Sequence, residues 1–521
     1  MNKKIFILYI FISIIFVSCF KDEGNYEYTE TKAPVFNIAK SYAMGYDEGN
    51  LIAHADYYYP QADSLELEKN TKCEWVLNGV VLGTGKDLSI PVSEAIEKLE
   101  LEDFGTYYGT FRVTNTQTGI SYLHKITYYI RPKFWKGSWL ILSEEGANSK
   151  LSYQRLYYER GADGEIIWIY QNYDNIFSEQ NEGKVIPGEP LQIIDYRASH
   201  INSMVGATTI LTKQVAWDIN NENFTLAADL SQEFTSGKPD YDYIKDIRYD
   251  NKYSFMLDNK GNLYTRKMSD NNLGGKYLTE PNCFDEKGAK IDFIGESKMG
   301  AYLYYLFDGK NNRLNVIDRM RSINPLEKSE GDHIVDVTNF GDDKEIIYVA
   351  GSQTTPLGAV NWNKDLAVVI YKKAGKLYAY ELVVNAYYGA LATTDKSREY
   401  ELPFTIGEDD LLWIPHYHNT SMPSKYQKAI CYTKGNEFRL YDREKEEDKL
   451  IFKCDHKITA LKFYGYYSKP KFYNWIAVGL ENGDFFMMDT EPEQPVMVEE
   501  TKFNVGGPIK SLSLIGSANA N

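Results

Sequence analysis

The chain has 521 residues and carries 57 lysines and arginines against 73 aspartates and glutamates, a net charge of −16. A chain of this length exceeds one ordinary hydrophobic core and indicates two or more domains. An acidic surface repels phosphate backbones, so the composition argues against nucleic acid as a partner. The 43 tyrosines favour strands over helices.

The N-terminal residues have the layout of a secretory signal. A basic start, MNKK, precedes a mostly apolar run over residues 5–16, and the small Ser18 comes directly before Cys19. An apolar run of about 12 residues is too short to span a bilayer, which needs about 20. The segment is therefore predicted to be a cleaved signal over residues 1–18; a plain secretory signal with a chance cysteine is the alternative.

Cys19 is followed by Lys21, Asp22 and Glu23. These residues resemble the lipobox and the surface-export signal of Bacteroidota lipoproteins. The resemblance implies that Cys19 is lipidated and that the protein is anchored in the outer membrane, facing the extracellular side. Several acyl chains on one cysteine anchor a protein stably, whereas a single chain does not. Residues 19–32 are polar and lack periodicity, which is typical of a tether.

The first folded domain is predicted over residues 33–132. Its strands alternate between apolar and polar residues and are separated by turn sequences, which is typical of an immunoglobulin-like sandwich. The clearest strands cover residues 72–77, 80–82, 105–115 and 120–130, and Asn78-Gly79 forms a hairpin turn between the first two. Cys73-Glu74-Trp75, followed by a Gly-Thr-Tyr strand that ends in Arg-Val-Thr-Asn, resembles a polycystic-kidney-disease (PKD) type domain. Trp75 is expected to fill the core between the sheets.

Residues 133–521 repeat one hairpin pattern, in which an apolar strand and a turn precede a second apolar or aromatic strand. Seven copies begin 45 to 69 residues apart, at residues 139, 208, 253, 303, 367, 429 and 475. This spacing fits four-stranded blades and predicts an all-β fold in which the sandwich is followed by a β-propeller. Seven blades are predicted, with six or eight left open, and a long two-sheet sandwich array is the alternative fold.

Cys73, Cys283, Cys431 and Cys454 are scattered and lack metal-ligand spacing, so they are expected to be small buried apolar residues. A disulfide between Cys431 and Cys454 is left open.

Two patterns suggest metal sites but do not complete them. Residues 258–262, Asp-Asn-Lys-Gly-Asn, lack the carboxylates of a calcium loop and are interpreted as a β-turn. His416 and His418 are two residues apart and would share one side of a strand, but no third zinc ligand is evident. No metal or cofactor is expected. Together with Trp413, the two histidines are a candidate ligand-binding loop.

A second candidate binding segment precedes the second hairpin. It runs from Asp195 and includes Tyr196, Arg197 and His200. The segment is interpreted as a connector that enters the inner strand of a blade, near the axial opening where propellers bind ligands. No Gly-x-Ser-x-Gly motif accompanies it, and no catalytic residue is assigned.

Signal, sandwich and repeats together resemble the PKD-like family lipoproteins of Bacteroidota. The resemblance implies a surface accessory of a SusC/SusD-type uptake system. The favoured hypothesis is a non-enzymatic protein that binds or presents a nutrient polymer, either a glycan or a peptide. A surface polysaccharide lyase or glycosidase and a structural subunit of a transporter complex are the alternatives.

Overall fold

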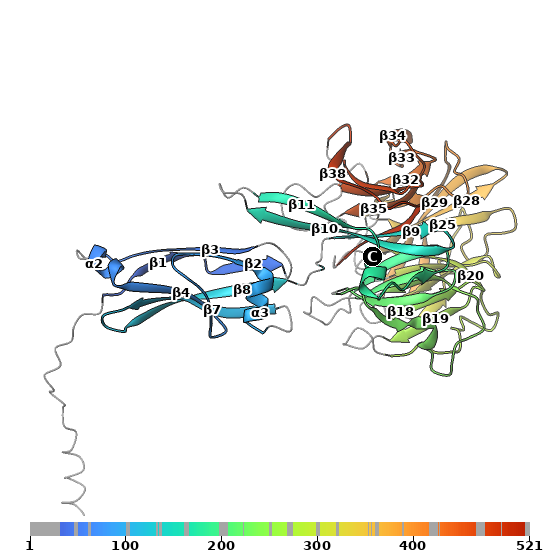
Figure 1. Cartoon of the computed structure of the whole chain (residues 1–521). Helices are drawn as coiled ribbons and strands as arrows, with labels where there is room; N and C mark the ends of the chain where they lie inside the picture. Colours follow the sequence, from blue (N-terminus) through green and yellow to red (C-terminus); the bar gives the residue numbers. More distant parts are fainter. Residues whose placement is uncertain are drawn as a thin grey trace, which may run out of the picture. The chain divides into compact units, whose positions relative to one another are not determined.

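The computed structural model describes residues 32–515, apart from internal stretches at 46–49, 61–63, 101–104, 132–133, 135–137, 161–165, 197–206, 222, 250–252, 268–274, 298–302, 319–321, 353, 356, 360–363, 388–389, 416–425, 427, 465–474 and 491. The fold is all-β, and the chain divides into two compact units, Met1–Pro132 and Lys133–Asn521 (Figure 1). Cys19, Lys21, Asp22 and Glu23 lie outside the described residues.

The first unit is a β-sandwich of two sheets. One sheet has the order β1-β3-β6, with β1 (Val35–Ile38), β3 (Asn50–Tyr58) and β6 (Asp87–Pro91). The other has the order β2-β8-β7-β4-β5, with β2 (Ser41–Gly45), β8 (Ser121–Arg131), β7 (Gly105–Asn115), β4 (Thr71–Leu77) and β5 (Val80–Thr84). Two short helices, α2 (Ser64–Lys69) and α3 (Val92–Lys98), connect strands. β2 runs parallel to β8, and the other described pairs in the unit are antiparallel.

Trp75 occupies the core between the two sheets, as predicted. Its side chain is fully buried, its ring centroid lies 4.7 Å from that of Phe111, and its Nε1–H donates to the Gly85 carbonyl oxygen at 3.1 Å. The hairpin turn at Asn78-Gly79 is also confirmed. Both residues have positive φ, 49° and 83°, as a two-residue turn that follows the strand twist requires.

The second unit is a seven-bladed β-propeller within the described residues. The strands of each blade are given from the axis outward. Blade 1 has β39 (Ile509–Leu514), β9 (Trp139–Glu145), β10 (Asn148–Arg160) and β11 (Ile166–Tyr173); blade 2 has β13 (Pro190–Tyr196), β14 (Ala207–Thr212), β15 (Ala216–Asn220) and β16 (Leu226–Asp229); and blade 3 has β17 (Ile244–Tyr249), β18 (Tyr253–Asp258) and β19 (Leu263–Lys267).

Blade 4 has β20 (Ile291–Ser297), β21 (Leu303–Asp308), β22 (Arg313–Ile317) and β23 (Ile323–Pro325); blade 5 has β25 (Glu345–Ser352), β28 (Lys364–Lys373), β29 (Lys376–Tyr387), β30 (Ala390–Glu401) and β24 (Glu327–Lys328); blade 6 has β31 (Leu412–Trp413), β32 (Ala429–Lys434), β33 (Glu437–Asp442) and β34 (Glu447–Lys453); and blade 7 has β35 (Ile458–Tyr464), β36 (Trp475–Leu480), β37 (Asp484–Asp489) and β38 (Val496–Asn504).

Smaller elements complete the second unit. β12 (Ile186–Pro187) pairs with β10, and β26 (Thr354–Thr355) pairs with β27 (Gly358–Ala359). The described helical segments are α4 (Ile176–Gln180) and the 3-10 turn η1 (Leu230–Gln232). Among the helices that the structure describes, none is long and apolar enough to cross a membrane.

The last strand of the chain closes the propeller ring. β39 pairs antiparallel with β9, so blade 1 combines strands from both ends of the unit. Leu512 and Leu514 of β39 are buried in the same cluster as Trp139 of β9. Closure pairs the edge that β9 would otherwise expose, and an exposed strand edge is a site of aggregation.

The seven predicted hairpins all occupy the same place in their blades, as the second and third strands from the axis. They are β9–β10, β14–β15, β18–β19, β21–β22, β28–β29, β32–β33 and β36–β37. The prediction of a propeller with seven blades is therefore confirmed, and the alternative of a two-sheet array is wrong.

The prediction of buried cysteines holds for two of the four described residues. Cys73 and Cys431 are buried, Cys454 is half-buried and Cys283 is exposed. Cys283 lies in an irregular segment after β19, outside any strand, which is why its apolar character does not bring it into a core. Cys431 and Cys454 are free thiols, so the disulfide left open between them is not formed.

Candidate functional site

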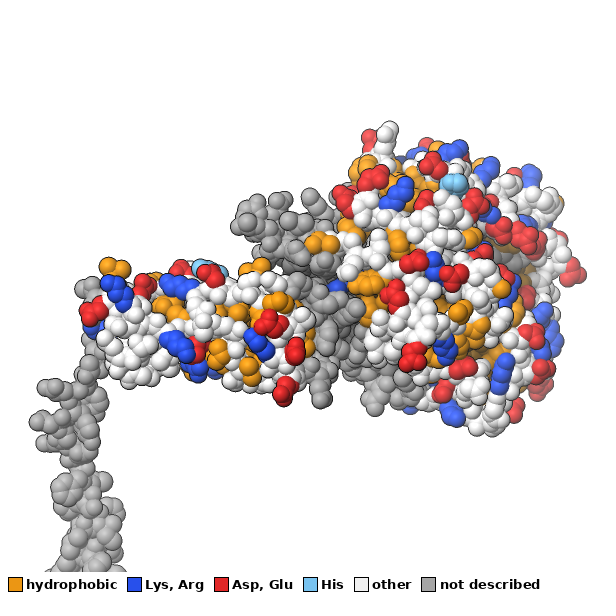
Figure 2. Space-filling model, viewed as in Figure 1, with side chains coloured by type: hydrophobic (Ala, Val, Ile, Leu, Met, Phe, Trp, Pro, Cys, Tyr) orange, Lys and Arg blue, Asp and Glu red, His pale blue; other side chains and the backbone are white. Residues whose placement is uncertain are grey.

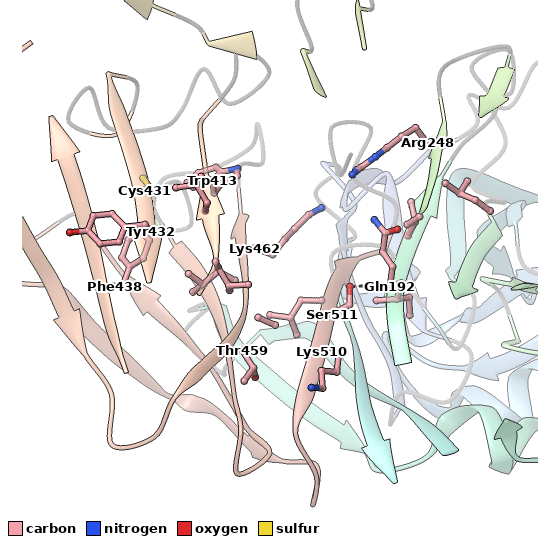
Figure 3. Close-up of a pocket in the computed structure, with 18 of the residues that line it drawn as sticks. Gln192, Arg248, Trp413, Cys431, Tyr432, Phe438, Thr459, Lys462, Lys510 and Ser511 are labelled. Atoms are coloured by element: carbon pink, nitrogen blue, oxygen red, sulfur yellow. Dashed lines mark hydrogen bonds between the residues drawn. The ribbon is translucent and has the colours of Figure 1, made fainter. Parts of the chain in front are cut away.

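Two adjoining cavities lie where the inner strands of the propeller converge. Their volumes are about 280 and 490 Å³. Together they are lined by residues of all seven inner strands, β13, β17, β20, β25, β31, β35 and β39. Residues shared by the two linings are Arg248, Trp413, Phe438, Leu461 and Lys462. We call this pair of cavities the axial site, and Figure 3 shows the smaller of the two.

Blade 6 contributes residues of three strands to the wall of the axial site. Its inner strand, β31, has two residues, whereas the other six inner strands have six to eight. Cys431 and Tyr432 of β32, which pair with Trp413 and Leu412 of β31, also line the cavity, as does Phe438 of β33. Between blades 4 and 5, Gly295 of β20 allows β25 to approach closely, because a Cβ atom there would collide with the Val349 carbonyl oxygen.

An aromatic pair forms part of the lining. Trp413 lines both cavities and stacks on Phe463 of β35, with ring centroids 5.1 Å apart and planes at 23°. Tyr426 supports Phe463 with an edge-on contact at 5.3 Å. Stacked and edge-on arrangements hold aromatic rings in fixed orientations. The pair therefore offers a pre-oriented apolar surface for a flat or cyclic ligand group.

Charged side chains of both signs also reach the axial site. Among the described lining residues, the cationic ones are Lys245, Arg248, Lys462 and Lys510, and the acidic ones are Asp246 and Asp292. Arg248 forms an ion pair with Asp246, with Nη2 and Oδ2 3.0 Å apart, and Lys510 forms one with Glu144 at 2.8 Å. Figure 3 shows the side chains of Arg248 and Lys462 entering the same space from β17 and β35 and pointing toward one another.

Cys431 and Tyr432 of β32, which line one of the cavities, carry uncharged polar side chains. The Tyr432 hydroxyl donates to Asp448 Oδ1 at 2.8 Å, and Arg439 Nη2 lies 2.8 Å from Asp448 Oδ2. Burial, followed by the hydrogen bond to Asp448, raises the pKa of Tyr432. Burial also raises the pKa of the Cys431 thiol, so this side chain is a protonated thiol and not a nucleophilic thiolate.

Two serines of β39 attach this strand to blade 2. Ser511 Oγ accepts a hydrogen bond from the Ile193 amide at 3.1 Å, and Ser513 Oγ accepts one from the Asp195 amide at 3.0 Å. These bonds satisfy backbone donors at the edge of β13, which pairs on its other side with β14. The closing strand therefore also helps to build the wall of the axial site.

The predicted segment around Asp195 is placed differently from the expectation. Asp195 and Tyr196 belong to the inner strand β13 itself, not to a connector that precedes the inner strand. Asp195 is buried, and its carboxylate accepts hydrogen bonds from Asn221 and Thr208. β14 was expected to be the inner strand because its apolar pattern is stronger than that of β13. The inner strand is β13, one strand earlier in the chain.

Of the other predicted binding residues, Trp413 is the one whose side chain the structure describes. It lines both cavities of the axial site. Arg197, His200, His416 and His418 lie outside the described residues, and Tyr196 is described only as the last residue of β13.

The cationic residues of the axial site were missed at the sequence level. Arg248, Lys462 and Lys510 lie on the first strand of their blades, which alternates weakly and does not stand out as part of the repeated hairpin. The position of a strand relative to the repeated hairpins could have identified these residues. In blades 2 to 7 the inner strand precedes the repeated hairpin, and the last strand of the chain supplies the inner strand of blade 1.

The turn at Asp258 has the geometry of a β-turn and not of a calcium loop. Asp258 Oδ1 accepts hydrogen bonds from the amides of Lys260 and Asn262, both at 2.8 Å. These bonds use the carboxylate within the turn. Among the described residues, no three His, Cys, Asp or Glu side chains are grouped so that they could hold a metal ion.

Comparison with known protein families gives a match over part of the chain. The model of the PKD-like family matches residues 19–190, which takes in the sandwich and β9–β12 of the propeller. No curated protein matches the chain.

Several solved structures resemble the chain. A quinonprotein alcohol dehydrogenase-like protein from Bacteroides thetaiotaomicron is 10% identical, with 92% of this chain and 99% of that chain covered and a TM-score of 0.35. The dihydro-heme d1 dehydrogenase NirN is 9% identical, with 74% and 77% covered and a TM-score of 0.37. Sqt1 of Saccharomyces cerevisiae is 11% identical, with 63% and 84% covered and a TM-score of 0.33.

Proposed function

We propose that this protein is a cell-surface lipoprotein that binds a nutrient polymer at the axial site and presents it, without cleaving it, to a SusC/SusD-type uptake system. The observation that carries the binding role is the axial site itself, where an aromatic pair and hydrogen-bonding side chains from seven strands meet in one concave region. The signal residues around Cys19 support anchoring at the surface.

The dimensions and lining of the axial site suit a short segment of polymer. Ligand sites commonly occupy about 300–1,000 Å³ and combine apolar surface with a few placed polar groups. The larger cavity, at about 490 Å³, falls in this range. Trp413 supplies a ring against which a sugar ring or a proline can pack, and it is oriented by Phe463 and not by the ligand. Pre-orientation lowers the entropy lost on binding.

The chemistry of the lining supports binding over catalysis. Cleavage of a glycosidic bond uses two carboxyl groups, one of which must be protonated. Asp246 is in an ion pair with Arg248, and a neighbouring cation favours the charged carboxylate. Cys431 is a protonated thiol, and the Tyr432 hydroxyl is engaged by Asp448. Asp246, Cys431 and Tyr432 are therefore poorly suited to act as a general acid or a nucleophile.

The test is retention on an array of polysaccharides and peptides, with a soluble chain that begins at Asn25. We expect retention on at least one polymer, and we expect the W413A variant to lose about tenfold or more in affinity, because removing one stacking ring costs roughly 1–3 kcal/mol. The W413F variant retains an aromatic ring and should keep most of the affinity. Y108A, which removes an exposed tyrosine of the sandwich, is the matched control and should bind normally.

Other results would favour the alternatives. Release of reducing ends or unsaturated products from any polymer, at a rate abolished by changes in the axial site, would favour a glycosidase or lyase. Co-purification with a transporter that W413A leaves unchanged, together with no retention on the array, would favour a structural subunit.

A further inference from the structure

The charge of the axial site is opposite in sign to that of the molecule. The chain carries a net charge of −16, whereas the described lining of the axial site holds four cationic side chains and two acidic ones. A solvated acidic surface explains the carboxylates on the outside, where Figure 2 shows acidic and basic side chains interspersed over the visible face. It does not explain why four of the six charged side chains in the described lining are cationic. A concave site whose lining is mainly of one sign of charge focuses its potential on whatever ligand enters.

Arg248 and Lys462 concentrate this charge at one position. Each lines both cavities, and Figure 3 shows that they approach from opposite sides and point toward one another. Two like charges that converge in a partly enclosed space repel each other, and an anion placed between them turns this repulsion into two attractive contacts. Asp246 pairs with Arg248, and Glu144 pairs with Lys510. The other charged residues of the described lining are Lys245, Lys462 and Asp292, which sum to +1.

The neutral groups around the cations suit a carbohydrate. Gln192, Thr459 and Ser511 line the same cavity as Arg248 and Lys462, and their amide and hydroxyl groups can exchange hydrogen bonds with sugar hydroxyls. Trp413, which lines both cavities, supplies the ring face. A hydroxyl-rich ring that carries one negative group matches this combination more fully than an acidic peptide, whose side chains offer no hydroxyl-rich ring.

We propose that the axial site is selective for acidic glycans, and that it binds the carboxylate or sulfate group of a sugar residue between Arg248 and Lys462. The inference rests on the proposed function, since it names the ligand class of the same site. The sugar ring lies near Trp413, and its hydroxyls contact Gln192, Thr459 or Ser511.

The experiment is isothermal titration of the full chain, purified in detergent, with four probes. These are oligogalacturonate for carboxylate, chondroitin sulfate oligomers for sulfate, maltohexaose as a neutral glycan and an oligoglutamate as an acidic peptide. We expect binding of one or both acidic glycans, at least about tenfold tighter than maltohexaose, with affinity that falls as salt is added. The two acidic glycans distinguish carboxylate from sulfate as the bound group.

Paired variants separate the local effect from the effect of total charge. R248Q/K462Q removes two charges from the axial site and should weaken acidic-glycan binding by about a hundredfold, roughly tenfold for each charge-assisted hydrogen bond. K434Q/K502Q removes two charges from exposed lysines of β32 and β38 and should bind as the unmodified chain does. The single variant K462R keeps the charge and should retain most of the affinity. Equal melting temperatures for the variants establish that each one is folded.

The outcomes distinguish the two proposals. Equal binding of maltohexaose and acidic glycans, or acidic-glycan binding unchanged in R248Q/K462Q, would overturn the selectivity and leave the proposed binding function in place. Binding of oligoglutamate alone would overturn the selectivity in favour of a peptide ligand. Absence of binding by every polymer on the array would overturn the proposed function itself.

Discussion

At the residue scale, buried charged groups hold neighbouring blades together. Arg443, directly after β33 in blade 6, forms an ion pair at 3.2 Å with Glu381 on β29 in blade 5, and both side chains have 0% exposure. Arg443 also donates to Ser352 Oγ at 2.6 Å, and Tyr400 donates to the Glu381 carboxylate at 2.8 Å. Buried charges are tolerated when they are paired and hydrogen-bonded in this way. The group therefore specifies which surface of blade 5 meets blade 6.

Removing one member of this pair should be strongly destabilising. We expect R443M to lower the free energy of unfolding by about 3–5 kcal/mol, because it leaves the Glu381 carboxylate buried without its cation. R443M/E381Q removes that uncompensated charge, keeps an acceptor for Tyr400 and should recover part of the loss. Urea unfolding followed by tryptophan fluorescence is the measurement, since seven of the eight tryptophans lie in the second unit.

The matched control for this prediction is K449M. Lys449 forms an exposed ion pair with Glu447, with both side chains about half exposed, and exposed pairs add little to the free energy of unfolding. A loss in R443M no larger than that in K449M would contradict the role assigned to the buried pair.

At the element scale, the repeated hairpins could be read from sequence because they are the middle strands of the blades. β18, β28, β32 and β36 are buried along nearly their whole length, since neighbouring blades cover both faces of the sheet. Continuous burial produces apolar runs that stand out from their surroundings. The inner strands face the axial site on one side, and outer strands such as β34 and β38 are largely exposed, so their patterns are weak.

The closing strand β39 is the element whose loss should matter most to the propeller. We expect L514A to lower the free energy of unfolding by about 2–4 kcal/mol, because Leu514 is 4% exposed and packs in the cluster that joins β39 to β9 and blade 7. V496A makes a comparable apolar truncation on β38, where Val496 is 57% exposed, and should change stability by no more than about 0.5 kcal/mol. The same urea unfolding experiment measures both, and equal shifts would show that β39 adds little to ring closure.

At the scale of the whole molecule, a small sandwich and a larger propeller share one chain, and the proposed anchor precedes both. The order of the two units was predictable because strand spacing changes near residue 132, from the short hairpins of a sandwich to repeats of 45 to 69 residues. The mixture of acidic and basic groups on the visible surface of the larger unit suits a body exposed to solvent (Figure 2).

The proposed location has its own test in a Bacteroidota host. We expect the Cys19→Ala variant to leave the membrane fraction, because the acylated side chain is lost. Replacing Lys21, Asp22 and Glu23 with alanine should keep the protein in the membrane fraction but protect it from protease added to intact cells. Membrane retention of the Cys19→Ala variant would contradict lipidation, and unchanged cleavage of the triple variant would contradict the export signal.

The sequence by itself determined the class of each unit, the number of blades and the central place of Trp75. These features depend on local alternation, turn chemistry and repetition, all of which are written in neighbouring residues. Tertiary structure alone decided the ring closure by β39 and the convergence of Arg248, Lys462 and Trp413 at the axis. These residues are separated by up to 214 positions in the chain, and they meet only because radial packing of the blades brings the first strand of every blade to the same place.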